Sequence, residues 1–345
     1  EEINTCIACN QACLDHVFSM KRATCLVNPR ACYETELNYL PTSHKKRIAV
    51  VGAGPAGLAC ADTSALRGHE VHLFEAAGEI GGQFNIAKQV PGKEEFSETL
   101  RYFKRQLQLN KVNVHLNKSI TAKELIDQGF DEIILATGVV PRQPPIPGVD
   151  HAKVLSYIEV LLEKKPVGKS VAIIGAGGIG FDVAEYLTHA GKSPSLDQDK
   201  FLKEWGIDQN LEARGGVDGC DQAIEASPRQ VYLLQRKTSK LGKGLGKTTG
   251  WIHRTTLKNK KVTMISGASY DKIDQQGLHI TVNDQQKLLS VDHVILCTGQ
   301  ESRRDLQAEL ESAGMATHLI GGAKLAGELD AKRAISDGCR LAASL

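Results

Sequence analysis

Four cysteines near the start of the chain are the residues best suited to do chemistry. They follow the spacing C-x2-C-x3-C-x11-C, at Cys6, Cys9, Cys13 and Cys25. Thiolates are the ligands that iron–sulfur clusters and zinc prefer. A dense triplet followed by one distant cysteine favours a [4Fe–4S] cluster over structural zinc, which usually pairs two short knuckles. Plain buried thiols are a third possibility, and we expect the leftover Cys32 to be a neutral buried thiol.

A glycine-rich turn follows the first apolar run, at residues 48–51. Gly52, Gly54 and Gly57 form the pattern G-x-G-x-x-G, which in a dinucleotide fold allows a tight turn, the approach of a pyrophosphate and close helix–strand packing. Glu75 ends the next apolar run, where a carboxylate suits ribose hydroxyls and repels a 2′-phosphate. Glycine turns without ligands are common, so the evidence lies in the complete set of strand, glycines, helix, strand and acid.

A second set of the same kind occurs further along the chain, with the opposite charge at its end. Its strands are expected at 170–174 and 230–234. Its glycines are Gly175, Gly177 and Gly180, and its terminal cations are Arg236, Lys237 and Lys240. Cations there suit the 2′-phosphate of NADP through charge-assisted contacts. The alternative is a solvated basic turn.

Further residues are expected to contact the cofactors. A second glycine loop, at 78–84, is expected to close over the ribityl chain and pyrophosphate of a flavin nucleotide. Backbone amides near Ile120 are expected to reach an adenine edge, and Trp251 to stack near a nicotinamide or flavin. The N-terminus of a terminal helix, beginning near residue 328, is expected to point at a flavin pyrimidine oxygen. These expectations involve Ala56, Gly82, Gln83, Lys93, Ile120, Trp251, Gly322 and Asp330.

Composition narrows the class of protein. The 345 residues are 41% hydrophobic and 24% charged, with a formal net charge of +2, so nothing favours nucleic acid as a partner. No apolar run reaches the ~18 residues that a membrane span needs, and no signal peptide opens the chain, so we expect a cytoplasmic protein with no membrane partner. Because the first residue is Glu1 rather than Met, we expect a fragment or a processed product.

These residues must be positioned by the expected strands and helices. Their order predicts an α/β protein with two Rossmann-like dinucleotide-binding domains, preceded by a small irregular cysteine-rich segment. The expected organisation is a cysteine segment at 1–45, a first domain at 46–150 and 298–345, and a second domain inserted at 151–297. Prolines between 141 and 147 stiffen the crossing segment between the domains. A polar stretch, 192–229, reads as a surface excursion with no assigned role.

Several blocks, in this order, resemble the C-terminal half of the bacterial NADPH-dependent 2,4-dienoyl-CoA reductase family of iron–sulfur flavoproteins. The blocks are the triplet at 6–13, Val-Asn-Pro at 27–29, and the runs at 81–88, 235–237, 244–254 and 328–335. The resemblance implies a [4Fe–4S] cluster on the four cysteines, FAD on the first glycine set with Glu75 and Gln83, and NADPH on the second set with Arg236 and Lys237. It implies a disulfide-reductase-like arrangement with the NADPH domain inserted in the FAD domain.

The resemblance also indicates what the chain lacks. Members of that family carry an N-terminal TIM barrel with FMN, where the dienoyl-CoA is reduced, and the catalytic tyrosine and histidine lie in the barrel. No such segment stands in these 345 residues, so we expect no catalytic residue of that step here. The barrel domain of the same enzyme and NADPH are the expected partners.

The expected function is therefore an NADPH-oxidising electron-transfer module of unsaturated fatty acid β-oxidation. Hydride passes from NADPH to FAD, and single electrons pass to the cluster and on to FMN. The second domain holds no Cys-x-x-Cys pair that would accept the electrons instead. Two alternatives are a non-redox ADP-binding module like that of amine dehydrogenases, and another NADPH:acceptor flavin reductase. A glutamate synthase small subunit would need more cysteines in the N-terminal region.

Overall fold

The computed structural model describes residues 2–327 and 330–345, and it forms two compact units. Unit 1 comprises Glu1–Asn85, Glu95–Arg142 and Gly299–Leu345, and unit 2 comprises Ile86–Glu94 and Gln143–Thr298. Unit 1 is thus discontinuous in sequence, and most of unit 2 lies between its second and third segments. Which nucleotide each unit binds stays a prediction.

Unit 1 is built on a five-stranded parallel sheet in the order β15-β4-β1-β2-β3. Its strands are β1 (Arg47–Val51), β2 (Glu70–Phe74), β3 (Asn113–His115), β4 (Glu132–Leu135) and β15 (Thr317–Leu319). The central strand reads Arg-Ile-Ala-Val-Val and is buried over its last four residues, as expected for a parallel strand covered on both faces. With β1 in the centre and a crossover on either side, this is the doubly wound arrangement, whose ligands bind at the carboxyl ends of the strands.

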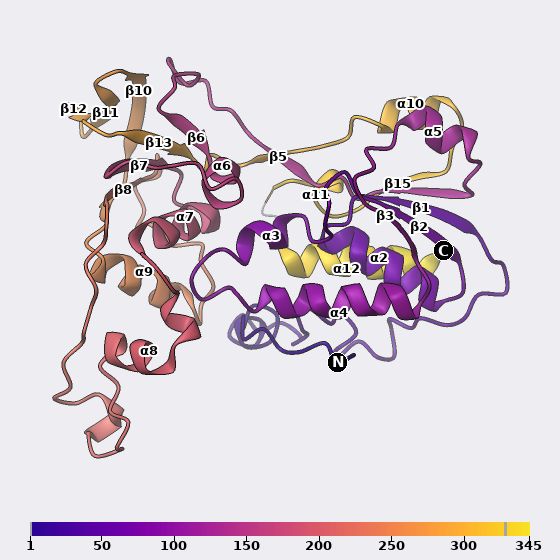
Figure 1. Ribbon diagram of the computed structural model, residues 1–345, viewed down its shortest axis with the longest axis horizontal. Helices are drawn as coiled ribbons and strands as arrows, with labels where there is room; N and C mark the ends of the chain where they lie inside the picture. Colours follow the sequence, from indigo (N-terminus) through magenta and orange to yellow (C-terminus); the bar gives the residue numbers. More distant parts are fainter. Residues whose placement is uncertain (1, 328–329) are drawn as a thin grey trace. The chain divides into compact units, whose positions relative to one another are not determined.

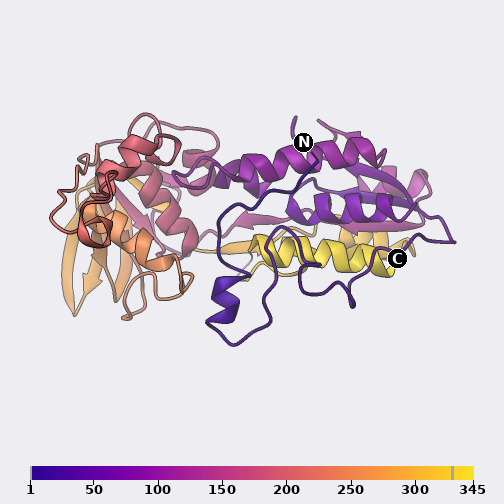
Figure 2. The same cartoon turned by 90° about the horizontal axis from the view of Figure 1, so that it is seen from below.

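Helices of unit 1 cover the sheet, and two of them pack unusually closely. The helices are α1 (Leu14–Val17), α2 (Pro55–Leu66), α3 (Gln83–Ala87), α4 (Phe96–Leu109), α5 (Ala122–Asp127), α10 (Gln307–Ser312), α11 (Gly321–Lys324) and α12 (Ala331–Ser344). Helix α2 and the yellow α12 lie side by side in both views (Figures 1 and 2). A Cβ atom added to Gly338 of α12 would stand 2.3 Å from the Ala56 carbonyl oxygen, so only glycine permits this approach.

The N-terminal segment packs on the core of unit 1 and has little regular structure of its own. Ala12, Leu26, Val27 and Leu37 are buried within the same hydrophobic cluster as β1, β2 and α2. The segment therefore draws its stability from burial against unit 1, since a segment this small cannot bury enough apolar surface by itself.

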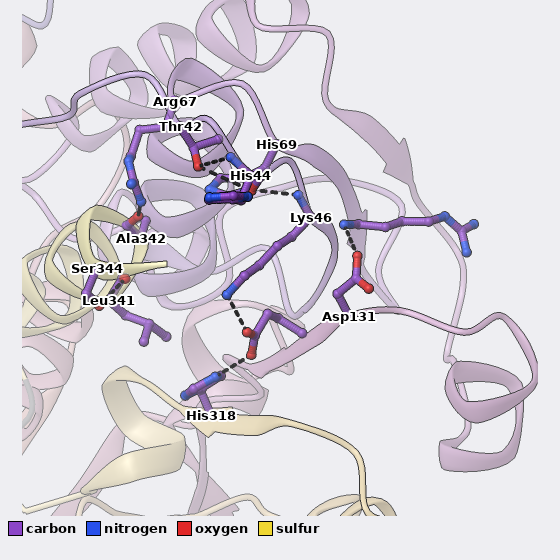
Figure 3. A network of polar contacts seen from close by, with 12 residues as sticks. Thr42, His44, Lys46, Arg67, His69, Asp131, His318, Leu341, Ala342 and Ser344 are labelled. Atoms are coloured by element: carbon purple, nitrogen blue, oxygen red, sulfur yellow. Dashed lines mark hydrogen bonds and ion pairs between the residues drawn. The ribbon is translucent and has the colours of Figure 1, made fainter.

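A polar network joins the amino ends of the central strands of unit 1 (Figure 3). Glu132 accepts from Lys46 Nζ at 2.7 Å and faces His318 Nε2 at 2.8 Å, while the Lys46 amide donates to His69 Nδ1 at 3.2 Å. Burial would raise the pKa of Glu132, but the hydrogen bonds from Lys46 and His318 outweigh it and lower that pKa. This network ties β1, β4 and β15 together at the end of the sheet opposite to the glycine turn, so we assign it a structural role.

Unit 2 repeats the doubly wound plan with a parallel sheet in the order β6-β13-β7-β8-β9. Its strands are β6 (Val154–Ser156), β7 (Ser170–Ile174), β8 (Gln230–Leu234), β9 (Thr263–Ile265) and β13 (His293–Leu296). A separate antiparallel sheet is formed by β10 (Ala268–Asp274), β11 (Gly277–Val282) and β12 (Gln285–Leu289). The helices are α6 (Tyr157–Leu161), α7 (Gly178–Thr188), α8 (Gln198–Trp205) and α9 (Gly250–Asn259).

The polar insertion 192–229 belongs to unit 2 and contains α8 with two short 3-10 turns, at Pro194–Leu196 and Arg214–Gly216. The insertion is attached to α9 by a buried cation. The Lys260 side chain is only 2% exposed, and its Nζ lies 3.0 Å from both Glu204 Oε1 and the Glu225 carbonyl oxygen. A cation this deeply buried requires such partners, so the insertion and the end of α9 form one packed structure.

A short antiparallel ribbon of unit 1, β5 (Val139–Pro141) with β14 (Gln300–Ser302), lies where the chain leaves and re-enters that unit. The two parallel sheets confirm the predicted α/β class with two Rossmann-like folds. Among the described residues, no helix is long and apolar enough to cross a membrane.

Candidate functional site

The first glycine turn has the sterics that its sequence predicts. Gly52 follows β1 with φ +106°, and a Cβ atom there would lie 2.4 Å from the Ala136 carbonyl oxygen. A Cβ atom on Gly57 would lie 1.9 Å from the Gly52 carbonyl oxygen, so α2 packs directly on the turn. Gly54, the N-cap of α2, has nothing within 4 Å of its added Cβ atom. The open position thus lies at a helix N-terminus, where free amides favour an anion.

The carboxylate of Glu75 is brought to this turn. It accepts hydrogen bonds from the Ala53 amide at 2.8 Å and from the Ala77 amide at 2.9 Å. Since Glu75 follows β2 directly, the parallel pairing of β2 with β1 places the acid beside the glycines. This is the juxtaposition that dinucleotide folds use for a ribose.

The second glycine loop packs against the first. The Gly81 amide donates to the Ala53 carbonyl oxygen at 2.8 Å, and a Cβ atom on Gly82 would lie 3.0 Å from the Gly54 Cα atom. Gln83 begins α3 immediately after this contact. The structure therefore gathers Gly82 and Gln83 at the carboxyl end of β1.

The C-terminal glycines and α12 meet the same region. A Cβ atom on Gly321 would lie 2.7 Å from the Ala56 side chain, and Gly322 follows in α11. Asp330 is the N-cap of α12, and its carboxylate accepts from the Arg333 amide at 2.7 Å. The start of α12 therefore stands capped and ordered in unit 1.

The side chain of Ile120 belongs to the core of unit 1. Its side chain is buried in a cluster with Phe74 and Leu125, away from solvent. The nearby Lys118 amide donates to the Glu75 carbonyl oxygen at 2.8 Å, which holds the segment at the end of β2. The predicted adenine contact through amides near Ile120 is consistent with this arrangement and stays a prediction.

Lys93 lies in the short segment Ile86–Glu94, which packs with unit 2. Its Nζ is 2.6 Å from Asp182 Oδ1, and both side chains are half-buried. Asp182 is on α7, two residues after Gly180, and the sequence analysis did not single it out. The proximity of an acid to the third glycine was the only available signal, and a sequence does not show which distant cation it pairs with.

The second glycine turn repeats the sterics of the first. Gly175 has φ +110°, with an added Cβ atom 2.2 Å from the Cys297 carbonyl oxygen. On Gly180 the added atom would lie 1.8 Å from the Gly175 carbonyl oxygen. Gly177, the N-cap of α7, has nothing within 4 Å. Unit 2 thus offers a second open helix N-terminus.

The cations after β8 are exposed on a braced loop. Arg236, Lys237 and Lys240 all lie at the surface. The Lys237 carbonyl oxygen accepts from Gln235 Nε2 and from the Gly267 amide, both at 3.0 Å. A loop fixed by its backbone with its charges free in solvent is suited to an anionic ligand.

Trp251 is the second residue of the helix α9 and is 53% exposed. It meets Trp205 of the insertion edge-on, with ring centroids 6.2 Å apart. On the same helix, Arg254 Nη1 donates to the Gly242 carbonyl oxygen at 3.0 Å and holds the basic glycine-rich loop to α9. The contact with Trp205 was not foreseen, because aromatic pairing across the insertion leaves no local pattern.

The four cysteines of the N-terminal pattern are free thiols. Burial raises the pKa of Cys9, and electrostatic repulsion from Cys25, Cys13 and Cys6 raises it further, against a hydrogen bond from the Gln11 backbone. Cys6, Cys13 and Cys25 therefore lie near enough to Cys9 to affect its pKa.

Backbone contacts bring the ends of this pattern together. The Thr24 amide donates to the Ala12 carbonyl oxygen at 2.8 Å, so the residues just before Cys25 and Cys13 are adjacent. The Ala8 amide donates to Cys6 Sγ at 3.4 Å, as amides do around thiolate ligands. In the described part of the chain, no three His, Cys, Asp or Glu side chains converge as they would around a bound metal ion. The donor set fits a thiolate-held centre, whose identity stays a prediction.

Cys32 departs from expectation. It is exposed, with φ +62°, and its amide donates to Glu34 Oε1 at 3.0 Å. The prediction of a buried thiol was wrong because a tight turn places the residue on the surface, where burial cannot be read from residue type.

Comparison with known proteins gives the family. The model of the pyridine nucleotide-disulphide oxidoreductase family matches residues 46–329. A metal reductase of Desulforamulus reducens is 31% identical over 94% of this chain and 48% of its own length. A cinnamate reductase of Clostridium sporogenes is 25% identical over 94% of this chain and 43% of its own length.

A solved structure agrees with these relatives. The structure of a 2-naphthoyl-CoA reductase bound to 2-naphthoyl-CoA superposes with a TM-score of 0.84 and 25% identity, over 100% of this chain and 47% of that one. The chain thus spans about half the length of the relatives it matches.

Proposed function

This chain belongs to the pyridine nucleotide-disulphide oxidoreductase family and is an NAD(P)H-dependent flavoprotein oxidoreductase, and from that premise we propose that it is the reductase half of an iron–sulfur ene-reductase. In this proposal, unit 1 binds FAD, unit 2 binds NADPH, and Cys6, Cys9, Cys13 and Cys25 hold a [4Fe–4S] cluster. The electrons leave toward an FMN barrel domain of the same enzyme.

One observation carries the proposal. Each open glycine turn is followed along the chain by a second strand, and the residues after these two strands carry opposite charges. Glu75 stands at the first turn, within hydrogen-bond distance of the Ala53 amide. Arg236 and Lys237 are exposed beside the second. An acid selects a free ribose and a pair of cations selects a 2′-phosphate, so the two turns suit two different dinucleotides.

The residues of each unit have definite tasks in this proposal. The amides at the start of α2 and α7 bind the pyrophosphates, with room left by Gly54 and Gly177. The capped N-terminus of α12 presents partial positive charge toward a developing negative charge. Bound flavin would supply the conversion between hydride transfer and one-electron transfer.

The cysteine loop supports a one-electron exit. Burial and the repulsion of three neighbouring cysteines raise the pKa of Cys9, and a cationic metal centre that neutralises the thiolates would offset that cost. The four-cysteine set is the ligand set of a [4Fe–4S] cluster. A cluster accepts one electron at a time, which is why a flavin has to stand between it and a hydride donor.

The substrate class follows from the resemblance and the relatives' names, not from a site on this chain. The metal, cinnamate and 2-naphthoyl-CoA reductases are each about twice as long as this chain. Two of these names denote conjugated acids or their CoA thioesters, which agrees in kind with the resemblance to 2,4-dienoyl-CoA reductase. We propose a conjugated acyl-CoA as the final acceptor, reduced in the barrel domain and not here.

Anaerobic rapid mixing tests the proposal. The full chain, loaded with FAD and reconstituted with iron and sulfide, is mixed with NADPH or NADH while flavin absorbance and the cluster's electron paramagnetic resonance signal are followed. We expect flavin bleaching first, with NADPH preferred, and then the signal of a reduced cluster. Loaded flavin that NADPH leaves unbleached would favour the ADP-binding module instead, and a zinc-only protein would refute the cluster.

A further inference from the structure

A histidine connects the cysteine loop to the terminal helix of unit 1. His16 lies on α1, one helical turn after Cys13, whose carbonyl oxygen accepts from the Val17 amide. His16 Nε2 is 3.0 Å from Lys332 Nζ, although 316 residues separate the two. Figure 2 shows the N-terminal loop beside the yellow α12.

The hydrogen bonds assign the proton on this ring. His16 Nδ1 is 2.8 Å from the Arg22 carbonyl oxygen, which can only accept, so Nδ1 carries the hydrogen. Nε2 then has a free lone pair and accepts from the Lys332 ammonium, which can only donate. We therefore assign a neutral imidazole and a charged lysine to this contact.

Among the described residues, no ion pair joins Lys332 to a carboxylate. It is the second residue of α12, two positions after the cap formed by Asp330. The residue is half-buried, so water screens its charge less than at an open surface. A half-buried ammonium held by a neutral acceptor keeps its positive charge.

We propose that Lys332, held by His16, is a positioning residue for electron transfer, and that its ammonium favours reduction of a cluster on the cysteine loop. The inference rests on the proposed function. Reduction adds one electron, and no bond forms or breaks, so the centre becomes more negative by one charge. Net charge and nearby polar groups set the potential of such centres. Lys332 is a fixed cation in contact with His16, which lies one helical turn from Cys13, so its field favours the reduced form.

Potentiometric titration of the full reconstituted chain tests this inference, with the cluster's paramagnetic resonance as the readout. In K332M we expect the ratio of reduced to oxidised cluster at the wild-type midpoint to fall about tenfold, which corresponds to about 59 mV for a one-electron couple. K332R keeps the charge and should stay near the wild-type midpoint. H16A, which frees the lysine, should lower the midpoint, and H16Q should restore it because its amide can donate to Arg22 and accept from Lys332.

The outcomes separate the two proposals. An unchanged midpoint in K332M, with cluster content equal to wild type, overturns the inference but leaves the proposed function standing. If K332M loses the cluster, H16A decides, and a wild-type midpoint there overturns the inference. Failure of the wild-type chain to show any cluster signal refutes the proposed function itself.

Discussion

Gly180 and Gly177 allow the strongest test of the second nucleotide turn, because one glycine is packed and the other is open. The added Cβ atom in G180A would stand 1.8 Å from the Gly175 carbonyl oxygen, whereas real Cβ contacts are rarely closer than 3.0 Å. The carbonyl cannot retreat freely, because Gly175 is itself packed on the Cys297 carbonyl. The backbone must therefore move by more than about 1 Å. We expect G180A to lose about 3 kcal/mol of stability, at the upper end of the costs of overpacking.

The matched control is G177A. Gly177 has φ −81°, which alanine adopts without strain, and its Cβ atom would meet nothing within 4 Å. We expect a stability loss below about 1 kcal/mol, from the weaker N-cap alone. The methyl group would occupy the place where a pyrophosphate approaches, so NADPH affinity should fall about tenfold or more.

The assay uses urea unfolding followed by tryptophan fluorescence. Both tryptophans of the chain, Trp205 and Trp251, lie in unit 2, so the signal reports the unit that carries the mutations. Flavin bleaching at increasing NADPH measures the affinity. If G180A unfolds like wild type, the packing argument is wrong. If G177A is as unstable as G180A, or binds NADPH normally, then Gly177 is not an open pyrophosphate position.

Three further predictions concern other groups. K260M removes a buried cation from its carboxylate partner and should cost about 3 kcal/mol in urea unfolding, whereas a loss below 1 kcal/mol would mean the pair contributes little. Burial raises the pKa of Asp62 to about 6, so the native state binds the Asp62 proton more tightly than the unfolded state does. The free energy of unfolding should therefore fall by up to about 3 kcal/mol as pH rises from 4 through 6. D62N, unfolded in urea at both pH values, should abolish that fall. The double variant R236A/K237A should raise the KM for NADPH at least tenfold, since each charge-assisted bond contributes about 1.5 kcal/mol or more. The KM for NADH should stay unchanged. Equal increases for both nucleotides would contradict the 2′-phosphate assignment.

Local patterns made much of unit 1 and unit 2 predictable. The apolar runs at 48–51, 71–74, 170–174 and 230–234 are parallel strands. The first and third glycines of each set are packed against backbone at less than 2.5 Å from an added Cβ atom. Such features are readable because strand burial and glycine sterics depend on a residue and its near neighbours.

Pairings between distant segments were not predictable. Lys93 packs with unit 2 and pairs with Asp182, 89 residues away. Trp251 meets an aromatic ring of the insertion, and Cys32 turns outward. A surface charge or ring in a sequence has many equivalent partners, and only packing of the complete chain selects one.

By itself the sequence determined the two glycine turns, the contrast of charge between Glu75 and Arg236, and the four-cysteine pattern, because each is encoded in residue type and spacing. Tertiary structure alone decided that the cysteine loop packs on unit 1 and that His16 meets Lys332. Contacts across 316 residues arise from how helices and loops pack, and no local rule of backbone geometry specifies them.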